Sequence, residues 1–171
     1  AGDQSITCST LLTESFYDVI FSNAGTTTVN PHLDIEDDVV ISGAAIMAPA
    51  ATRNIFVGDD WTNYATGGFA EGTSTVDFDG GGDQNLNNSG GTENFYNVSF
   101  TNAGTTTSNS ILDISNDVTY SGSAVLNPSN NSVFVGRNWV NGSSGGFTEG
   151  LGTVTFDGVG AQVLICSSIG T

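Results

Sequence analysis

Short segments in which apolar and polar residues alternate recur along the chain, roughly every 20 residues. The alternation is clearest in Leu33-Asp34-Ile35 and in Val76-Asp77-Phe78, and it predicts strands with one buried and one exposed face. Gly, Asn and Asp separate these segments, as is typical of turns. The predicted strand segments are Tyr17–Phe21, Leu33–Ile41, Ile55–Val57 and Thr75–Phe78, then Tyr96–Phe100, Leu112–Tyr120, Val133–Val135 and Thr153–Phe156.

The segments belong to a long internal repeat. Residues 16–43 match residues 95–122 at an offset of 79 with 18 of 28 positions identical, and residues 55–80 match residues 133–158 at an offset of 78 with 15 of 26 identical. Such identity is far above what shared composition produces. We therefore expect one repeat array over residues 1–171, with repeat one at 16–94, repeat two at 95–171 and a partial preceding repeat at 1–15.

Four strand segments in each repeat predict four rungs of a parallel β-solenoid, and about eight to nine rungs in all. In a solenoid each rung buries its apolar face against its neighbours, so small repeats share one core. The alternative is two tandem β-sandwich modules of about 79 residues each. We rank it second because no linker between modules is visible in the sequence.

The charge balance excludes several functions. The chain has 2 basic residues against 18 acidic ones, for a net charge of -16. Nucleic acid binding needs clustered Lys and Arg, and Arg53 and Arg137 do not form a cluster. No apolar stretch is long enough to insert into a membrane. The N-terminus lacks the pattern of a signal peptide, so we expect Ala1 to be a mature or trimmed end.

The two cysteines share one repeat position. Residues 80–88 recur as residues 158–166 and, in part, as residues 1–8, so Cys8, Asn88 and Cys166 are equivalent. In a solenoid Cys8 and Cys166 lie about eight rungs apart, or nearly 40 Å, which is too far for a disulfide within one chain. Head-to-tail contact between copies brings equivalent positions together and propagates into a filament. We predict an intermolecular disulfide between Cys8 and Cys166.

Other candidate sites are weaker. Exposed Trp61 and Trp139 would form a stacking platform for glycans, whereas a semi-buried position for each tryptophan in the turn after Val-Gly is the favoured alternative. We expect no enzyme, because no nucleophile, base or metal cluster converges in the sequence, and no cofactor. The runs Thr26–Thr28 and Thr105–Thr107 suggest a flat threonine array only if other rungs contribute to it. Calcium takes carboxylate oxygens, and its weak candidates are Asp34, Asp37, Asp38, Asp59 and Asp60.

The motifs FVG-x-x-W-x-N, GGF-x-EG-x-x-TV-x-FDG and NAGTTT resemble the Gly/Asn/Thr-rich repeats of large secreted, adhesin-like surface proteins of Bacteroidetes. The resemblance covers nearly the whole chain and implies an extracellular or cell-surface location in a Gram-negative bacterium. We expect an extracellular structural protein that assembles with itself, head to tail, into a fibre or surface filament. The alternative is a binding module of a cell-surface adhesin that recognises glycans.

Overall fold

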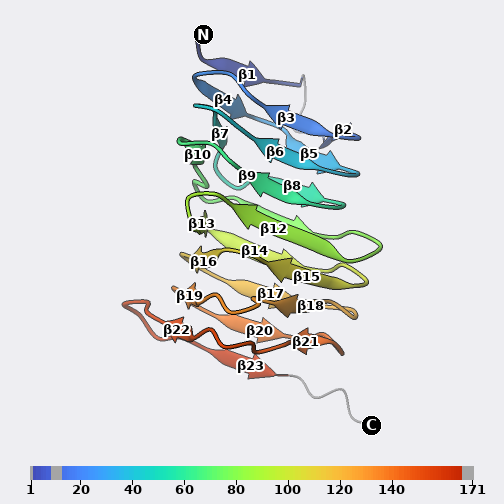
Figure 1. Ribbon diagram of the computed structural model, residues 1–171, viewed down its shortest axis with the longest axis vertical. Coiled ribbons are helices and arrows are strands. Elements are labelled where there is room, and N and C mark those ends of the chain that lie inside the picture. Colours follow the sequence, from blue (N-terminus) through green and yellow to red (C-terminus); the bar gives the residue numbers. More distant parts are fainter. Residues whose placement is uncertain (1, 9–12, 167–171) are drawn as a thin grey trace.

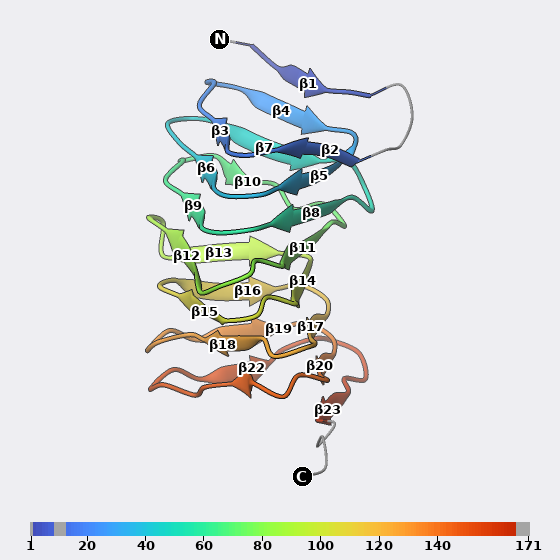
Figure 2. The ribbon, with the colours of Figure 1, turned by 90° about the vertical axis from the view of Figure 1, so that its right-hand side faces the viewer.

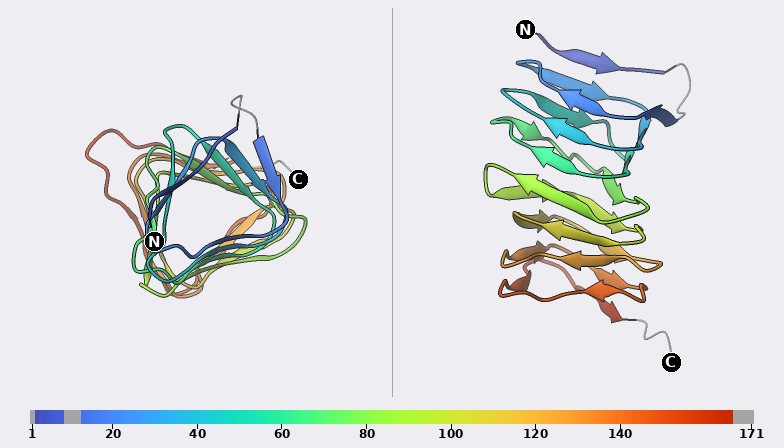
Figure 3. Two further views of the ribbon diagram at one scale, coloured as in Figure 1. Left: turned by 90° about the horizontal axis from the view of Figure 1, so that it is seen from above. Right: turned by 45° about the vertical axis from the view of Figure 1, so that its right-hand side comes forward.

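The predicted parallel β-solenoid is confirmed. The structure is a computed structural model and describes residues 2–8 and 13–166. Viewed from above, its turns superpose as a triangle with three sides (Figure 3). Every turn adds one strand to each side, and the longest unbroken sheet carries eight strands. The solenoid therefore has about eight turns, with its first and last strands at opposite ends (Figure 1). The described residues include no helix long and apolar enough to cross a membrane.

The strands of each side stack in parallel (Figures 1 and 2). Side one consists of two four-stranded sheets, β1 (Gln4–Ile6), β4 (Thr26–Val29), β7 (Ile46–Pro49) and β10 (Gly68–Phe69), then β13 (Thr92–Phe95), β16 (Ile111–Ile114), β19 (Val133–Val135) and β22 (Val154–Phe156). Side two is β2 (Thr13–Phe16), β5 (His32–Ile35), β8 (Asn54–Val57), β11 (Thr75–Phe78), β14 (Asn97–Phe100), β17 (Val118–Tyr120), β20 (Trp139–Asn141) and β23 (Leu164–Cys166). Side three is β3 (Val19–Phe21), β6 (Val39–Ile41), β9 (Trp61–Asn63), β12 (Gln84–Asn88), β15 (Thr105–Ser108), β18 (Val125–Asn127) and β21 (Gly146–Phe147).

Alternation within the strands builds one continuous core. In β5 and β8 the buried side chains are Leu33, Ile35, Ile55 and Val57, while the residues between them face outward. Parallel pairing places Leu33 beside Ile55 and Ile35 beside Val57. These inward residues thus lie beside like residues of the next turn. Burying an aliphatic side chain of this size stabilises the fold by roughly 1.5 to 3 kcal/mol.

The repeat contains more strands than the sequence predicted. Leu33–Ile41 is not one strand but two, β5 and β6, which meet at a corner of the triangle. If each repeat is counted from its first strand, three residues before the predicted repeat start, repeat one carries the eleven strands β2–β12 and repeat two carries the eleven strands β13–β23. Because three strands complete a turn, eleven strands make three and two-thirds turns. Equivalent strands therefore lie on different sides: β5 is on side two, whereas its equivalent β16 is on side one.

One corner of the triangle is lined by closely approaching backbones. A Cβ atom on Gly58 would lie 2.2 Å from the carbonyl oxygen of Glu36 in the turn above. A Cβ atom on Gly80 would lie 2.0 Å from the carbonyl oxygen of Gly58. Real Cβ atoms do not approach a backbone oxygen so closely, so glycine is required here for the turns to stack.

Candidate functional site

Both tryptophans lie in the core. Trp61 is 0% exposed and Trp139 is 5% exposed. The Trp61 ring packs edge-on against Phe69 at a centroid distance of 5.0 Å, and Trp139 packs in the same way on Phe147 at 5.2 Å. A sugar can stack only on an exposed ring face, so the predicted glycan platform at Trp61 and Trp139 is wrong.

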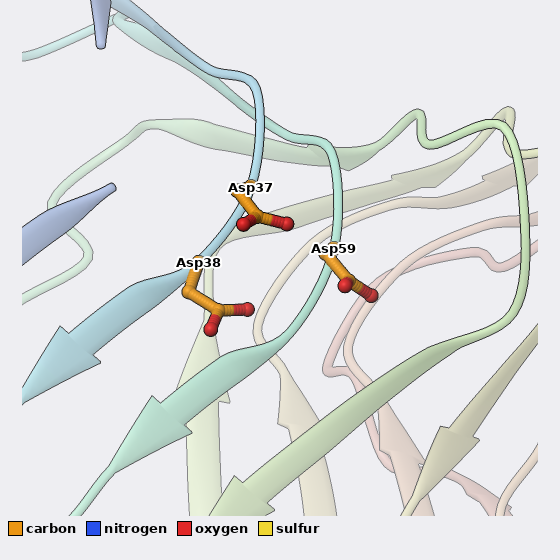
Figure 4. A group of neighbouring side chains, drawn as sticks. All are labelled: Asp37, Asp38 and Asp59. Atoms are coloured by element: carbon orange, nitrogen blue, oxygen red, sulfur yellow. The ribbon is translucent and has the colours of Figure 1, made fainter. Parts of the chain in front are cut away.

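Three of the five calcium candidates do meet. Asp37, Asp38 and Asp59 come from the corners before β6 and β9, and each offers a carboxylate oxygen within 4.8 Å of the others (Figure 4). Asp34 and Asp60 lie outside this group. Burial raises the pKa of Asp38 and Asp59 from the ordinary value, and neighbouring carboxylates add to the rise. At Asp38 a hydrogen bond from the Asp60 backbone N–H partly opposes it. Three carboxylates therefore lie close together without a basic residue among them. A calcium ion at Asp37, Asp38 and Asp59 stays a prediction.

In repeat two an arginine replaces one of these acidic residues. The equivalents of Asp38 and Asp59 are Asp117 and Arg137, and their Oδ2 and Nη1 atoms lie 3.6 Å apart. The equivalent turns thus carry an arginine in repeat two and three carboxylates in repeat one, although they lie at different corners of the triangle: Asp38 precedes β6 and Asp117 precedes β17.

We expect Asp59→Arg to stabilise the protein by about 1 kcal/mol at low salt, because it removes repulsion and adds the exposed ion pair found in repeat two. Thermal unfolding at pH 7 in low and high salt measures the effect, which should shrink as salt is added. Arg137→Asp is the reverse variant and should lower the melting temperature. An unchanged melting temperature for Asp59→Arg at low salt would show that the three carboxylates do not repel each other appreciably.

The two cysteines lie at opposite ends of the solenoid. Cys8 follows β1, and Cys166 ends β23. The eight strands of side two span seven strand spacings, or about 34 Å. A disulfide needs Cα atoms within about 7 Å, so Cys8 and Cys166 of one chain cannot pair with each other.

An aromatic cluster fills the boundary between the two repeats. On side one, β10 and β13 belong to separate sheets, so no strand pairing joins the described repeats there. Phe95 of β13 lies instead against Trp61, Phe69 and Phe78, with ring centroids 5.6, 5.9 and 6.2 Å away. Phe95 is fully buried. This cluster, which we call the junction cluster, replaces backbone pairing with side-chain packing.

A buried carboxyl group lies beside the junction cluster. Glu93 is 1% exposed, and its carboxylate oxygens accept hydrogen bonds from Asn63 Nδ2 at 3.0 and 3.2 Å and from Asn88 Nδ2. Burial raises the pKa of Glu93 to about 7, and the amide donors only partly oppose this rise. Glu93 therefore titrates near neutral pH inside the repeat boundary.

The two ends of the solenoid expose the equivalents of these buried residues. Phe16 and Phe156 are 38% and 39% exposed, whereas their equivalents Phe95 and Phe78 are 0% exposed. At the C-terminal end a hollow of about 450 Å³ is lined by Trp139, Asn141, Phe147, Phe156, Leu164 and Cys166. A second hollow, of about 460 Å³, lies at the N-terminal end between β1 and β3. Both ends therefore present core-type surface.

Sequence reasoning missed the residues that matter most at the ends. Phe16, Phe147 and Phe156 look like ordinary core positions because each has an identical or similar equivalent inside the chain. Glu93 carried no signal of its own, since its equivalent Glu14 shares the same T-E-x-F context. The available signal was the repeat phase: residues equivalent to those of the repeat boundary recur where the repeats begin and end.

A comparison of the chain with family models, with curated proteins and with solved structures finds no match.

Proposed function

We propose that this protein is an extracellular structural protein, a β-solenoid subunit that joins copies of itself head to tail into a fibre. The observation that carries the proposal is the contrast between equivalent residues. Leu86 is fully buried inside the repeat boundary, whereas its equivalent Leu164 is 62% exposed at the C-terminal end. Phe16 and Phe156 show the same contrast with Phe95 and Phe78.

The open strand edges support the same proposal. β22 and β23 each have a neighbour on one edge only, and so do β2 and β3 at the other end. Unpaired edges of parallel sheets are templates for further strands. Because the two ends differ, their contact is heterologous and does not close on itself, so it continues along the axis. The resemblance of the repeats to those of secreted surface proteins supports the extracellular location.

Sedimentation velocity over a range of protein concentrations tests the proposal. We expect mass to grow with concentration, and electron microscopy to show unbranched rods of single-solenoid width. A single species of 17.5 kDa at every concentration up to the millimolar range would refute the assembly.

We further expect Cys8 and Cys166 of neighbouring copies to cross-link when an oxidant such as dioxygen or a small disulfide accepts the two electrons and two protons of the thiols. Cys166 ends β23 at the C-terminal end and Cys8 follows β1 at the N-terminal end, so a head-to-tail junction brings the two cysteines to the same interface. A non-reducing gel should show a ladder that collapses with reductant, and Cys166→Ser should abolish the ladder. Rods without a ladder would leave the assembly standing and remove the covalent lock.

A further inference from the structure

The repeat boundary inside the chain shows how two ends fit together. There the end of repeat one, β10 to β12, meets the start of repeat two, β13 to β15. Residues 75–78 of β11 pair with residues 97–100 of β14, and Phe78 stacks on Phe100 at 5.6 Å. The same two kinds of segment are exposed at the C-terminal and N-terminal ends of the solenoid. The boundary is therefore a template for contact between copies.

The hollow at the C-terminal end is the junction cluster with one ring absent. Trp139 and Phe147 keep the edge-on arrangement of Trp61 and Phe69, with centroid distances of 5.2 and 5.0 Å. Phe156 lies 6.4 Å from Trp139 and completes the wall. In the boundary the corresponding space holds Phe95. The residue equivalent to Phe95 is Phe16, which is exposed at the other end of the solenoid.

Two copies in contact would bring two equivalents of β12 to the junction, whereas the boundary inside the chain contains β12 only once. Inside the chain, β12 pairs with β9 on one edge and with β15 on the other. Its equivalent β23 pairs only upward, with β20, and its equivalent β1 pairs only downward, with β4. β23 and β1 each keep a hydrogen bond that β12 makes to a neighbouring turn. Gln162 Nε2 donates to Val135 O at 2.7 Å, as Gln84 Nε2 does to Val57 O.

The downward contact of β1 is likewise that of β12. Asp3 Oδ1 accepts a hydrogen bond from Thr26 N at 3.0 Å, as Asp83 Oδ1 does from Thr105 N at 2.8 Å. In a junction built like the boundary, only one of the two strands, β1 of one copy or β23 of the other, can therefore occupy the position that β12 has in the stack. At equivalent positions, residues 163–165 are Val163, Leu164 and Ile165, whereas residues 5–7 are Ser5, Ile6 and Thr7. The more apolar strand, β23, therefore gains more from burial in that position.

Resting on the head-to-tail assembly proposed above, we propose that the C-terminal hollow seats Phe16 of a second copy and that β23 displaces β1 of that copy. The second copy then buries Phe16 against Trp139, Phe147 and Phe156, and Leu164 takes the buried position of Leu86. The 22 strands β2–β23 separate equivalent points of neighbouring copies, which is seven and one-third turns. The rise is about 35 Å per copy, with a rotation of one-third of a turn apart from the twist of the solenoid itself.

Sedimentation velocity on the full chain and three variants tests the proposal. Phe16→Ala should raise the concentration needed for association at least 10-fold, because the hollow loses its occupant. Tyr64→Ala removes an aromatic side chain that is 58% exposed in the middle of the solenoid, and it should associate as the wild type does. Deletion of residues 1–12 should lower the required concentration about 10-fold, because no strand then has to leave. Circular dichroism checks that each variant keeps its strand content.

The outcomes separate this inference from the proposed function. A wild-type chain that never associates overturns both. If Phe16→Ala associates as the wild type does, the assembly stands but Phe16 does not bind in the C-terminal hollow. If the deletion of residues 1–12 weakens association, the assembly stands but β23 does not displace β1. Electron microscopy gives a second readout, since a junction that retains both β1 and β23 has 23 strands per copy. Its rise is about 37 Å, and its rotation is two-thirds of a turn.

Discussion

Gly80→Ala should lower the free energy of unfolding by about 3 kcal/mol, the upper range for forcing atoms into a packed interior. The Cβ atom would lie 2.0 Å from the carbonyl oxygen of Gly58, which belongs to the backbone of the neighbouring turn. That oxygen cannot rotate away as a side chain can, so the turns must separate locally. Separation stretches the backbone hydrogen bonds between them, such as the bond from Asp79 N to Val57 O.

The neighbouring glycines supply a matched control. A Cβ atom on Gly82 meets no atom within 4 Å, and Gly82 is exposed. Gly82→Ala should therefore be neutral or slightly stabilising, because alanine restricts the unfolded chain. Chemical denaturation of both variants under identical conditions measures the difference. Equal stability of Gly80→Ala and Gly82→Ala would mean that the turns are not stacked as tightly at this corner as the structure has them.

Glu93→Gln should stabilise the protein by up to about 3 kcal/mol at pH 8 and have little effect at pH 4. The folded protein holds the Glu93 proton up to a pKa of about 7, whereas the ordinary carboxyl value is 4.5. Between these values the folded state binds more protons than the unfolded state. The free energy of unfolding therefore falls as the pH rises from 4.5 to 7 and stays low above 7. Glutamine is neutral throughout and keeps an oxygen that accepts from Asn63 and Asn88.

Denaturation of wild type and Glu93→Gln at pH 4 and pH 8 isolates this group, because the other titrating residues are common to both proteins. Glu14→Gln changes the equivalent residue at the open N-terminal end, where Glu14 is only half-buried, and should give a much smaller difference between the two pH values. If Glu93→Gln changed stability equally at both pH values, ionisation inside the repeat boundary would not be the cause.

The alternation of apolar and polar residues and the internal repeat predicted much of the fold, because both depend directly on residue type. Leu33, Ile35, Val76 and Phe78 were expected to face inward, and all four are fully buried. Several of the strands that the sequence did not reveal are polar. Thr26–Val29 and Gln84–Asn88 place threonine, glutamine and asparagine in strands, where neighbours of the same kind pair with them across turns.

The candidate site was harder to predict, since it depends on position in the stack more than on residue type. Phe16 and Phe95 are the same residue in the same local context, yet one is exposed and the other buried because only Phe95 has a turn above it. Trp61 and Trp139 suggested a ligand surface by their chemistry, but they face the interior. Residue type alone does not tell which side of a strand faces the core when a corner interrupts the alternation.

The mismatch between eleven strands per repeat and three strands per turn limits what a partner can recognise. Thr26–Val29 is on side one, whereas its equivalent Thr105–Ser108 is on side three, so the threonine runs do not form one flat array. In a longer row of such repeats, a given residue returns to the same side only every third repeat, about 53 Å along the axis. A flat, closely spaced partner therefore gains little avidity from repetition. Only a partner that encircles the rod, or whose own sites are tens of ångströms apart, can engage several repeats at once.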